Sequence, residues 1–196
     1  MATDVSRKLD RRTTLLQAAR EVLAEKGYEA TKVSDIVARA GAAQGTFYLY
    51  FPSKLSLVLA ITEDMNRDIL ATVQAALESA PTLAAGIDAG VAAAFAAMGR
   101  YQDLLGIIHG RLAMSELRDE CERLFQEEYT FIAAIIRAGQ ATGEIEAGVD
   151  PEIAARLIVG MLEHAADECY IYDSLTPTEA YIAEVARFIR RALGVK

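Results

Sequence analysis

The chain has 196 residues, of which 53% are hydrophobic and 24% are charged, a balance that is typical of a folded globular protein and argues against a disordered one. No apolar run approaches the about 18 residues that a membrane span requires, and the N-terminus is charged where a signal peptide would be apolar. We therefore expect a cytoplasmic protein with no membrane partner. A formal net charge of −8 argues against a nucleic-acid partner for the chain as a whole.

The charge is divided unevenly along the chain. Residues 1–55 contain nine Lys and Arg residues against six Asp and Glu residues, which gives this segment a net charge of +3. The rest of the chain therefore carries a net charge of −11. This asymmetry predicts a basic N-terminal head that binds a polyanion and an acidic body that the same polyanion repels.

The first predicted helix spans about residues 10–26. Leu16, Ala19 and Leu23 recur there at the spacing that places apolar side chains on one helical face. Gly27 follows directly, and glycine commonly ends a helix because it adopts the left-handed conformation without strain. This pattern predicts an amphipathic helix that packs against the next elements of the chain.

The second helix is predicted from Lys32 to Ala40, with Thr31 as its N-cap. Gly41 permits a tight turn, and a third helix follows from Gln44 to Tyr50. Three short helices with a glycine turn between the last two are typical of a helix-turn-helix DNA-binding domain. We place this domain at residues 1–52.

The remaining residues, 53–196, are predicted to form a second helical domain. All four prolines lie where a helix would begin, since proline is tolerated in the first turn of a helix and disruptive further in. Together with the glycines they predict six further helices, at about residues 53–79, 82–100, 103–109, 116–141, 151–172 and 178–193. The fold class is therefore all-α, with about nine helices.

The segment from Gly27 to Leu57 resembles the DNA-binding domain of the tetracycline-repressor (TetR) family of bacterial regulators. In that family a Gly-Tyr-x-x-Thr run and an apolar pair precede Gly-x-x-x-Gly-Thr-x-Tyr-x-[His/Tyr]-Phe-x-x-Lys-x-x-Leu. The spacing is unbroken here, through Gly27, Tyr28, Thr31, Ile36, Val37, Gly41, Gly45, Thr46, Tyr48, Tyr50, Phe51, Lys54 and Leu57. The chain departs from the family at Ala43, where a serine usually caps the recognition helix.

The resemblance implies that the third helix enters the major groove of a double-stranded DNA operator. Glutamine can read adenine through two hydrogen bonds, and threonine can contact the methyl group of thymine. The DNA-binding residues implied in this way are Thr31, Ala43, Gln44, Thr46, Tyr48, Tyr50 and Lys54. The alternative for the two tyrosines is that they are half-buried packing residues.

Four basic residues precede the first apolar face. Arg7, Lys8, Arg11 and Arg12 form either an arm that reaches an adjacent groove of the DNA or a solvated tail.

The last two helices carry apolar stripes. The resemblance implies that they pair with the same helices of a second subunit, so that a homodimer reads two successive major grooves. The expected interface residues are Ile153, Leu157, Met161, Ala165, Tyr181, Val185, Phe188 and Ala192. The alternative is that these stripes face the core of their own subunit.

The body is also expected to hold a small, largely apolar effector that releases the protein from DNA by shifting its conformation. Methionine and aromatic residues supply adaptable apolar surface, and one histidine and one arginine could anchor polar groups. The expected lining is Met65, Phe95, Met98, Tyr101, Ile107, His109, Arg111, Phe125 and Tyr129. The alternative is that these residues are ordinary core.

Two other functions remain open. An enzyme would use one of the two histidines, and His164 is followed by Asp167 and Glu168 on one helical face, but no catalytic or phosphate-binding motif accompanies them. We therefore expect no enzymatic activity, no cofactor and no metal. A dimeric ligand-binding or protein-interaction module that has lost DNA binding is the second alternative, and the retained DNA-contact motif argues against it.

Overall fold

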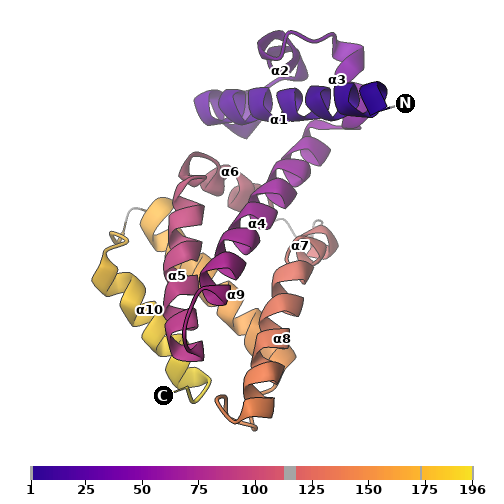
Figure 1. Ribbon diagram of the computed structural model, residues 1–196. Coiled ribbons are helices and arrows are strands. Elements are labelled where there is room, and N and C mark those ends of the chain that lie inside the picture. The colour runs from indigo at the N-terminus through magenta and orange to yellow at the C-terminus, as the bar shows by residue number, and fades with distance from the viewer. Residues whose placement is uncertain (1, 113–117, 173, 196) are drawn as a thin grey trace.

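The computed structural model describes residues 2–112, 118–172 and 174–195, with the side chains of residues 2–9, 108–112, 118 and 121 left aside. Ten helices and no strand occur in these ranges, so the all-α prediction is confirmed. Figure 1 shows a small head of three helices standing on one end of a larger helical body. No helix in these ranges is long and apolar enough to cross a membrane.

The head is the predicted three-helix domain, formed by α1 (Ala2–Ala30), α2 (Val33–Arg39) and α3 (Gln44–Tyr50). The three apolar residues predicted on one face of α1 are buried together with Ile36 of α2 and Phe47 of α3. Gly27 has a φ of 71°, so the regular part of α1 ends at the predicted glycine. Three apolar faces around one shared core hold this domain together.

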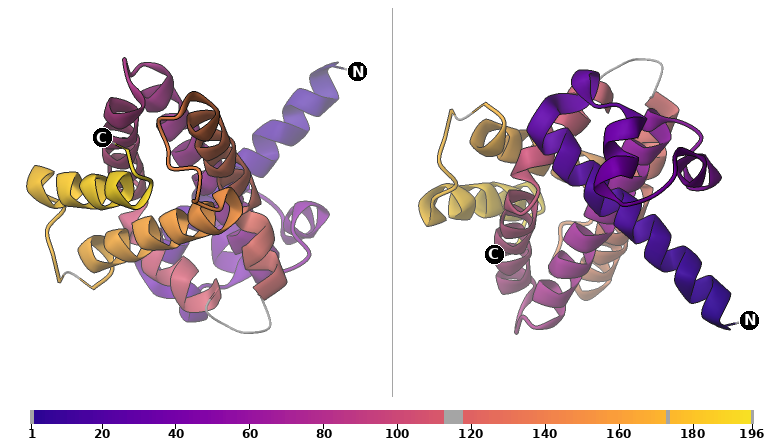
Figure 2. Two further views of the ribbon diagram at one scale, coloured as in Figure 1. Left: turned by 90° about the horizontal axis from the view of Figure 1, so that it is seen from below. Right: turned by 90° about the horizontal axis from the view of Figure 1, so that it is seen from above.

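Helix α1 begins at Ala2, about eight residues before the predicted start. Figure 2 shows its N-terminal part projecting beyond the rest of the molecule. Apolar periodicity marks only the part of a helix that packs, and in this chain that part starts at Leu15. The prediction was therefore too short because the first turns of α1 lack an apolar face.

The body consists of the seven helices that follow, namely α4 (Lys54–Glu78), α5 (Leu83–Gly99), α6 (Gln102–Leu112), α7 (Arg118–Leu124), α8 (Gln126–Thr142), α9 (Pro151–Tyr170) and α10 (Glu179–Ala192). Five of the six predicted helices are present, with ends within three residues of the predicted ones. The starts of α4, α5, α9 and α10 are set by side-chain caps, since the hydroxyl or carboxylate oxygens of Ser53, Thr82, Asp150 and Thr178 each accept a backbone N–H of the first turn.

The remaining predicted helix, at about residues 116–141, is two helices in the structure, α7 and α8. The described residues therefore form ten helices where about nine were predicted. The break lies at Phe125, whose φ of −101° and ψ of 2° are not helical. The side-chain amide of Asn66 in α4 donates to the carbonyl oxygen of Leu124 at 3.1 Å, and this bond satisfies an acceptor at the end of α7. No proline or glycine marks the break, so the sequence pattern gave no sign of it.

Two buried apolar clusters hold the chain together. The first spans the head and the near end of the body, since Leu15 and Phe47 share it with Leu57 of α4 and Leu104 of α6. The second lies in the body between α5, α8, α9 and α10. Helix α4, about 37 Å long at 1.5 Å per residue, runs from the head into the body, and its buried apolar residues belong to the first cluster (Figure 1).

Candidate nucleic-acid interface and ligand pocket

Helix α3 presents a row of exposed side chains on the head. Phe47 is fully buried and fixes the helix to the core, whereas Gln44 is exposed and Tyr48 is 52% exposed. Leu49 is 82% exposed, which is unusual for a large apolar side chain, and it was not among the predicted contact residues. A short helix with a buried anchor and an exposed polar face has the form of a recognition helix.

Three further predicted contact residues, Ala43, Thr46 and Tyr50, lie in this helix or directly before it. Ala43 is exposed and precedes α3 in an extended conformation, without a side-chain hydrogen bond to the first turn. Thr46 and Tyr50 are partly exposed, and the ring of Tyr50 packs 6.4 Å from that of Phe51, between centroids. The packing alternative therefore applies in part to Tyr50, whereas Tyr48 is free to reach a ligand.

Gly45 occupies the exposed face of α3. A Cβ built at this position would meet no atom within 4 Å, so the free protein has room for a side chain there. Glycine inside a helix costs roughly 0.5–1 kcal/mol relative to alanine. Its presence therefore needs a reason outside the fold of the free head, and close approach of another molecule is one such reason.

Thr31 corrects two predictions. Its side chain is only 2% exposed, and its hydroxyl donates to the carbonyl oxygen of Gly27 at 2.7 Å. Helix α2 begins after Lys32, whose backbone N–H donates to the carboxylate of Asp35 at 3.1 Å, so Thr31 is not the N-cap. A hydroxyl that is buried and engaged in this way does not contact a phosphate in this conformation, and we remove Thr31 from the contact set.

Lys54 links the head to α4. Its ammonium group donates to the carbonyl oxygens of Tyr28 at 2.6 Å and of Thr31 at 2.8 Å, and its Nζ lies 4.1 Å from the centroid of the Tyr28 ring. An ammonium has three donors, so one remains for a phosphate. In the free protein Lys54 is therefore first of all a structural tie at the start of α4.

The residues of the predicted basic arm have different surroundings in the structure. The guanidinium of Arg12 lies 3.6 Å from a carboxylate oxygen of Asp64 in α4 and 5.8 Å from the centroid of the Phe51 ring, so it connects the head to α4 rather than forming an arm. Arg11 is exposed. The side chains of Arg7 and Lys8 lie outside the described residues.

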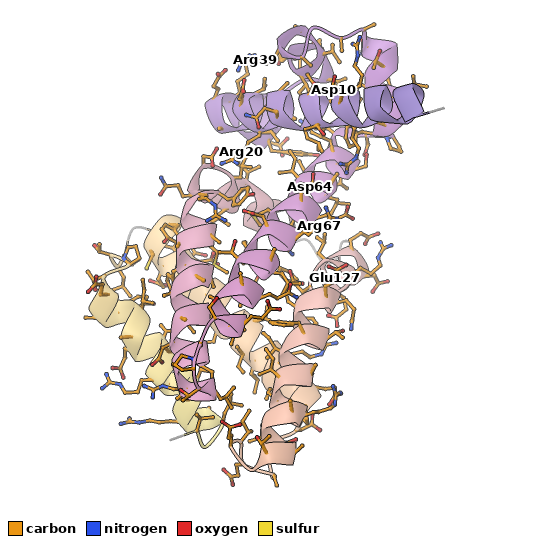
Figure 3. The ribbon with its side chains drawn as sticks, in the orientation of Figure 1. Asp10, Arg20, Arg39, Asp64, Arg67 and Glu127 are labelled. Atoms are coloured by element: carbon orange, nitrogen blue, oxygen red, sulfur yellow. The ribbon has the colours of Figure 1, made fainter. Side chains whose placement is uncertain are left out.

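Arg20 of α1 connects the head to the corner between α5 and α6. Its Nη2 lies 3.0 Å from a carboxylate oxygen of Asp103 and donates to the carbonyl oxygen of Arg100 at 2.5 Å. Figure 3 shows Arg20 on the side of α1 that faces the body, and Asp64 nearby on α4. The head is therefore held to the body at two separate places along α1.

The same corner is tied to α4. Arg100 and the hydroxyl of Tyr101 both donate to Oδ2 of Asp68, at 2.7 Å and 3.1 Å. The hydrogen bond from Arg100 is the largest cause that lowers the pKa of Asp68. Asp68 adjoins Ile69, which lines the cavity described next. A chain of polar contacts thus runs from α1 to the wall of the cavity.

A cavity of about 90 Å³ lies in the body between α4, α5, α8 and α9. Its lining is mostly apolar, with Met65, Met98 and Phe125 among the predicted residues. A second cavity of about 80 Å³ adjoins it and shares part of its wall, namely Val73, Ala94, Phe131, Ile132 and Leu162. The two cavities therefore lie side by side in the body, and we refer to them together as the passage.

Three carboxyl groups line the first cavity, and the sequence reasoning named none of them as lining. They belong to Glu128 of α8 and to Glu163 and Asp167 of α9. Burial, followed by the nearby charges of Asp167 and Glu128, raises the pKa of Glu163 to about 8. Burial also raises the pKa of Glu128. The spacing of Glu163 and Asp167 on one helical face was the only signal that the sequence offered.

The other predicted pocket residues lie elsewhere. Phe95 is buried in the second cluster with its ring edge-on to Tyr181, and Tyr101 and Ile107 pack against the first cluster. Tyr129 stands beside Phe125 under the guanidinium of Arg156, outside the lining. For Phe95, Tyr101 and Ile107 the core alternative is the better description, whereas Tyr129 is partly exposed and belongs to neither cluster. The side chains of His109 and Arg111 lie outside the described residues.

An apolar face is exposed on α9 and α10, on the side of the body away from the head. Ile153, Leu157 and Phe188 are 59%, 68% and 61% exposed, and with Met161 and Ala192 they line a hollow of about 440 Å³. The other predicted interface residues, Ala165, Tyr181 and Val185, face the core of their own subunit. The core alternative therefore describes these three residues, and the dimer interface stays a prediction for the exposed ones.

His164 is on the surface, with a 75% exposed side chain 3.9 Å from the carboxylate of Glu168. Within the described part of the chain, no three His, Cys, Asp or Glu residues are arranged to hold a metal ion.

Residues 15–61 match the family model of the bacterial regulatory proteins of the tetR family, and residues 87–193 match the tetracyclin repressor-like C-terminal domain. The chain is similar to YvdT, an uncharacterised HTH-type transcriptional regulator of Bacillus subtilis, with 33% identity over 181 residues that cover 92% of this chain and 93% of the relative. It is 32% identical over 167 residues to the HTH-type transcriptional repressor KstR2 of Rhodococcus jostii, covering 80% and 78%.

A solved structure of similar fold is the transcriptional regulator FadR of Bacillus subtilis in complex with stearoyl-CoA, with a TM-score of 0.79 and 23% identity over 90% of this chain and 96% of that one. KstR2 and FadR are both transcriptional regulators. Since the C-terminal family model alone spans more than half of the chain and the N-terminal model coincides with the helix-turn-helix head, this protein belongs to the TetR family of DNA-binding transcriptional regulators.

Proposed function

We propose that the protein is a cytoplasmic repressor that binds a near-palindromic DNA operator as a homodimer and is released by a small, largely apolar effector held in the body. The observation that carries the DNA part is helix α3, in which buried Phe47 anchors an exposed face formed by Gln44, Gly45 and Tyr48. The net charge of +3 in residues 1–55 favours approach to DNA, while the acidic body faces away.

The apolar face of α9 and α10 supports the homodimer. Three large apolar side chains that are more than half exposed would cost solvation free energy in a monomer, and a two-fold axis would bury them against their own copies. Gly160 is exposed on the same helix with open space around it, which permits close approach of a second α9. Two heads related by this axis could read successive major grooves about 34–36 Å apart.

The head–body contacts support a mechanism of release. Helix α4 lines the effector cavity and also carries Lys54 and Asp64, which contact the head. An effector that enlarges the passage would displace α4 and the Arg20 contact together, and it would thereby change the separation of the two recognition helices. The free energy of this coupling equals the difference between the effector's affinities for the two conformations.

The proposal is tested by selecting an operator from random double-stranded DNA and measuring its affinity for Tyr48→Ala and Lys54→Ala variants by fluorescence anisotropy. Tyr48→Ala should weaken binding about 10- to 100-fold and leave the melting temperature unchanged, because the side chain is half exposed. Lys54→Ala should lower both affinity and stability, because its ammonium ties the head to α4.

Raising the salt concentration should weaken operator binding steeply, since cationic groups of the head displace counterions from DNA. Binding that neither substitution changes, or that is insensitive to salt, would refute the assignment of α3 as the recognition helix.

A further inference from the structure

Leu49 of α3 is the most exposed large apolar side chain in the described part of the molecule, at 82%. It belongs to neither of the two buried clusters and is not among the partly buried residues that pack against them. A single exposed leucine carries little information by itself. The position of Leu49 within α3, relative to the residue that anchors this helix, makes it informative.

Leu49 and Gly45 lie on the side of α3 that faces away from its anchor, Phe47. Each residue of an α-helix is rotated by about 100° from the one before it, so the residues two positions before and two positions after Phe47 both point away from the core. Gly45 and Leu49 are these two residues, and they are neighbours at the i,i+4 spacing. We call them the apolar centre of α3, because neither has a polar side-chain atom.

Hydroxyl groups flank the apolar centre. On an ideal helix Thr46 and Tyr48 lie about 80° to either side of it. Each can donate a hydrogen bond to a phosphate oxygen, and phosphates form the two edges of a DNA groove. None of the seven residues of α3 is charged. An apolar line between two hydroxyl-bearing margins therefore fits a groove that is read at its floor by an apolar contact.

Gly45 allows this line to come close to another molecule. A Cβ built at Gly45 would meet no atom within 4 Å, so packing of the free head does not require a glycine there. Helical side chains lean towards the N-terminus of their helix, so Leu49 leans towards the bare backbone at Gly45. A surface that approaches α3 closely at Gly45 is therefore in contact with Leu49 as well.

The chemistry of DNA limits what an apolar side chain can recognise in the major groove. The base edges there present hydrogen-bond donors and acceptors, and their apolar group is the C5-methyl of thymine. Leucine neither donates nor accepts a hydrogen bond, so it distinguishes bases through this methyl group. The net charge of +3 in residues 1–55 favours DNA over a further protein as the occupant of this face.

We propose that Leu49 is a specificity-determining residue that contacts the C5-methyl group of a thymine in each half of the operator. This inference rests on the proposed function, because it requires α3 to enter the major groove. It adds a base contact to those expected from Gln44 and Thr46, and it gives Gly45 a role in bringing α3 close to the base edges.

The experiment uses an operator selected from random double-stranded DNA, in which each thymine is replaced in turn by uracil, symmetrically in both half-sites. Uracil keeps the base pair and lacks only the methyl group. Fluorescence anisotropy with the full chain should show one position at which the replacement weakens binding roughly tenfold, since burial of one methyl group favours binding about fourfold in each half-site.

Two variants assign this effect to its residue. Leu49→Ala should weaken binding to the thymine operator roughly tenfold or more and should bind the thymine and uracil operators equally. Its melting temperature should stay unchanged, because the side chain is exposed. Tyr48→Ala is the matched control on the same helix: it should also weaken binding, but it should keep the preference for thymine at that position.

The inference is overturned if no uracil replacement weakens binding, or if Leu49→Ala keeps the parent's preference for thymine. A chain that binds its operator through Tyr48 and salt-sensitive contacts, yet ignores every thymine methyl group, contradicts only the role of Leu49. A chain that selects no operator contradicts the proposed function, and this inference with it.

Discussion

The head and the body of this protein place their candidate functional side chains in opposite ways. The head exposes most of them on a short helix, α3, so they are close together along the chain and lie on the surface. The body collects them from α4, α5, α8 and α9 around an internal passage. The two regions also differ in charge, since the head has a net positive charge and the cavity in the body carries carboxyl groups.

The largest expected effect is a loss of operator affinity when the apolar face of α9 and α10 is disrupted. Leu157→Asp places a charge on a 68% exposed position of α9, so the subunit should fold and fail to dimerise. Operator affinity should fall at least 100-fold, because a single head keeps only half of the contacts. Sedimentation velocity and anisotropy measure the two effects. Leu175→Asp, at an exposed apolar position outside this face, should change neither, and a dimeric Leu157→Asp variant would contradict the interface.

The second prediction concerns the free energy of unfolding and how it depends on the buried carboxyl group of Glu163. The raised pKa of Glu163 means that the folded protein holds a proton that the unfolded chain releases between about pH 4.5 and 8. Stability should therefore fall as pH rises through this window, and Glu163→Gln should remove that part of the fall. At pH 8 the variant should be more stable than the parent by on the order of 4 kcal/mol, since one unit of pKa shift corresponds to about 1.4 kcal/mol.

Urea unfolding at pH 5 and pH 8 measures this difference. At pH 5 the two proteins should be nearly equal. A variant that is destabilised to the same extent at both pH values would show that Glu163 does not carry a raised pKa.

The third prediction separates folding of the head from its function. Gly45→Ala should stabilise the free protein by roughly 0.5–1 kcal/mol, because alanine favours a helix and the added methyl group meets no atom. The same methyl group should weaken operator binding about tenfold if α3 approaches DNA closely at this position. Thermal unfolding and anisotropy on one preparation test both. Unchanged operator affinity would show that Gly45 does not face the DNA.

The smallest expected effect is at the start of the same helix. Ala43→Ser restores an oxygen that can accept a first-turn N–H, and this cap should stabilise the helix end by about 0.5–2 kcal/mol. Operator affinity should increase or stay the same, because a helix that is already ordered loses less entropy on binding. A clear loss of affinity would mean that the N–H groups at this end bind phosphate directly and that the serine competes with it.

The head could be recognised from the sequence because the residues that form it are close together along the chain. Phe47 and Tyr48 are adjacent, so a helix that buries one must expose the other or place it at the edge. The failures had tertiary causes. Thr31 matched the motif, yet its hydroxyl is used inside the head, and Lys54 matched it as a phosphate contact while holding two carbonyl oxygens of the turn that precedes α2. A motif specifies which residue is present and leaves open which partner that residue has.

In the body the sequence located helices well and cavity residues poorly. Aromatic and methionine residues at helical spacing look the same whether they line a cavity or fill a core. Of the predicted residues whose side chains the structure describes, only Met65, Met98 and Phe125 line the first cavity. The break at Phe125 depends on an amide of Asn66, which lies 58 residues away from the carbonyl oxygen that it contacts. Such a long-range partner leaves no periodic signal along the chain.

The sequence by itself determined the helical fold class, the starts of the capped helices, the helix-turn-helix of the head and the segregation of charge, because each depends on residues close together along the chain. The tertiary structure decided which face of α9 meets its own core and which stays exposed. It also decided that carboxyl groups of α8 and α9 share one apolar cavity. The physical reason is that burial and pKa depend on neighbours from other helices, whose approach is set by packing of the whole body.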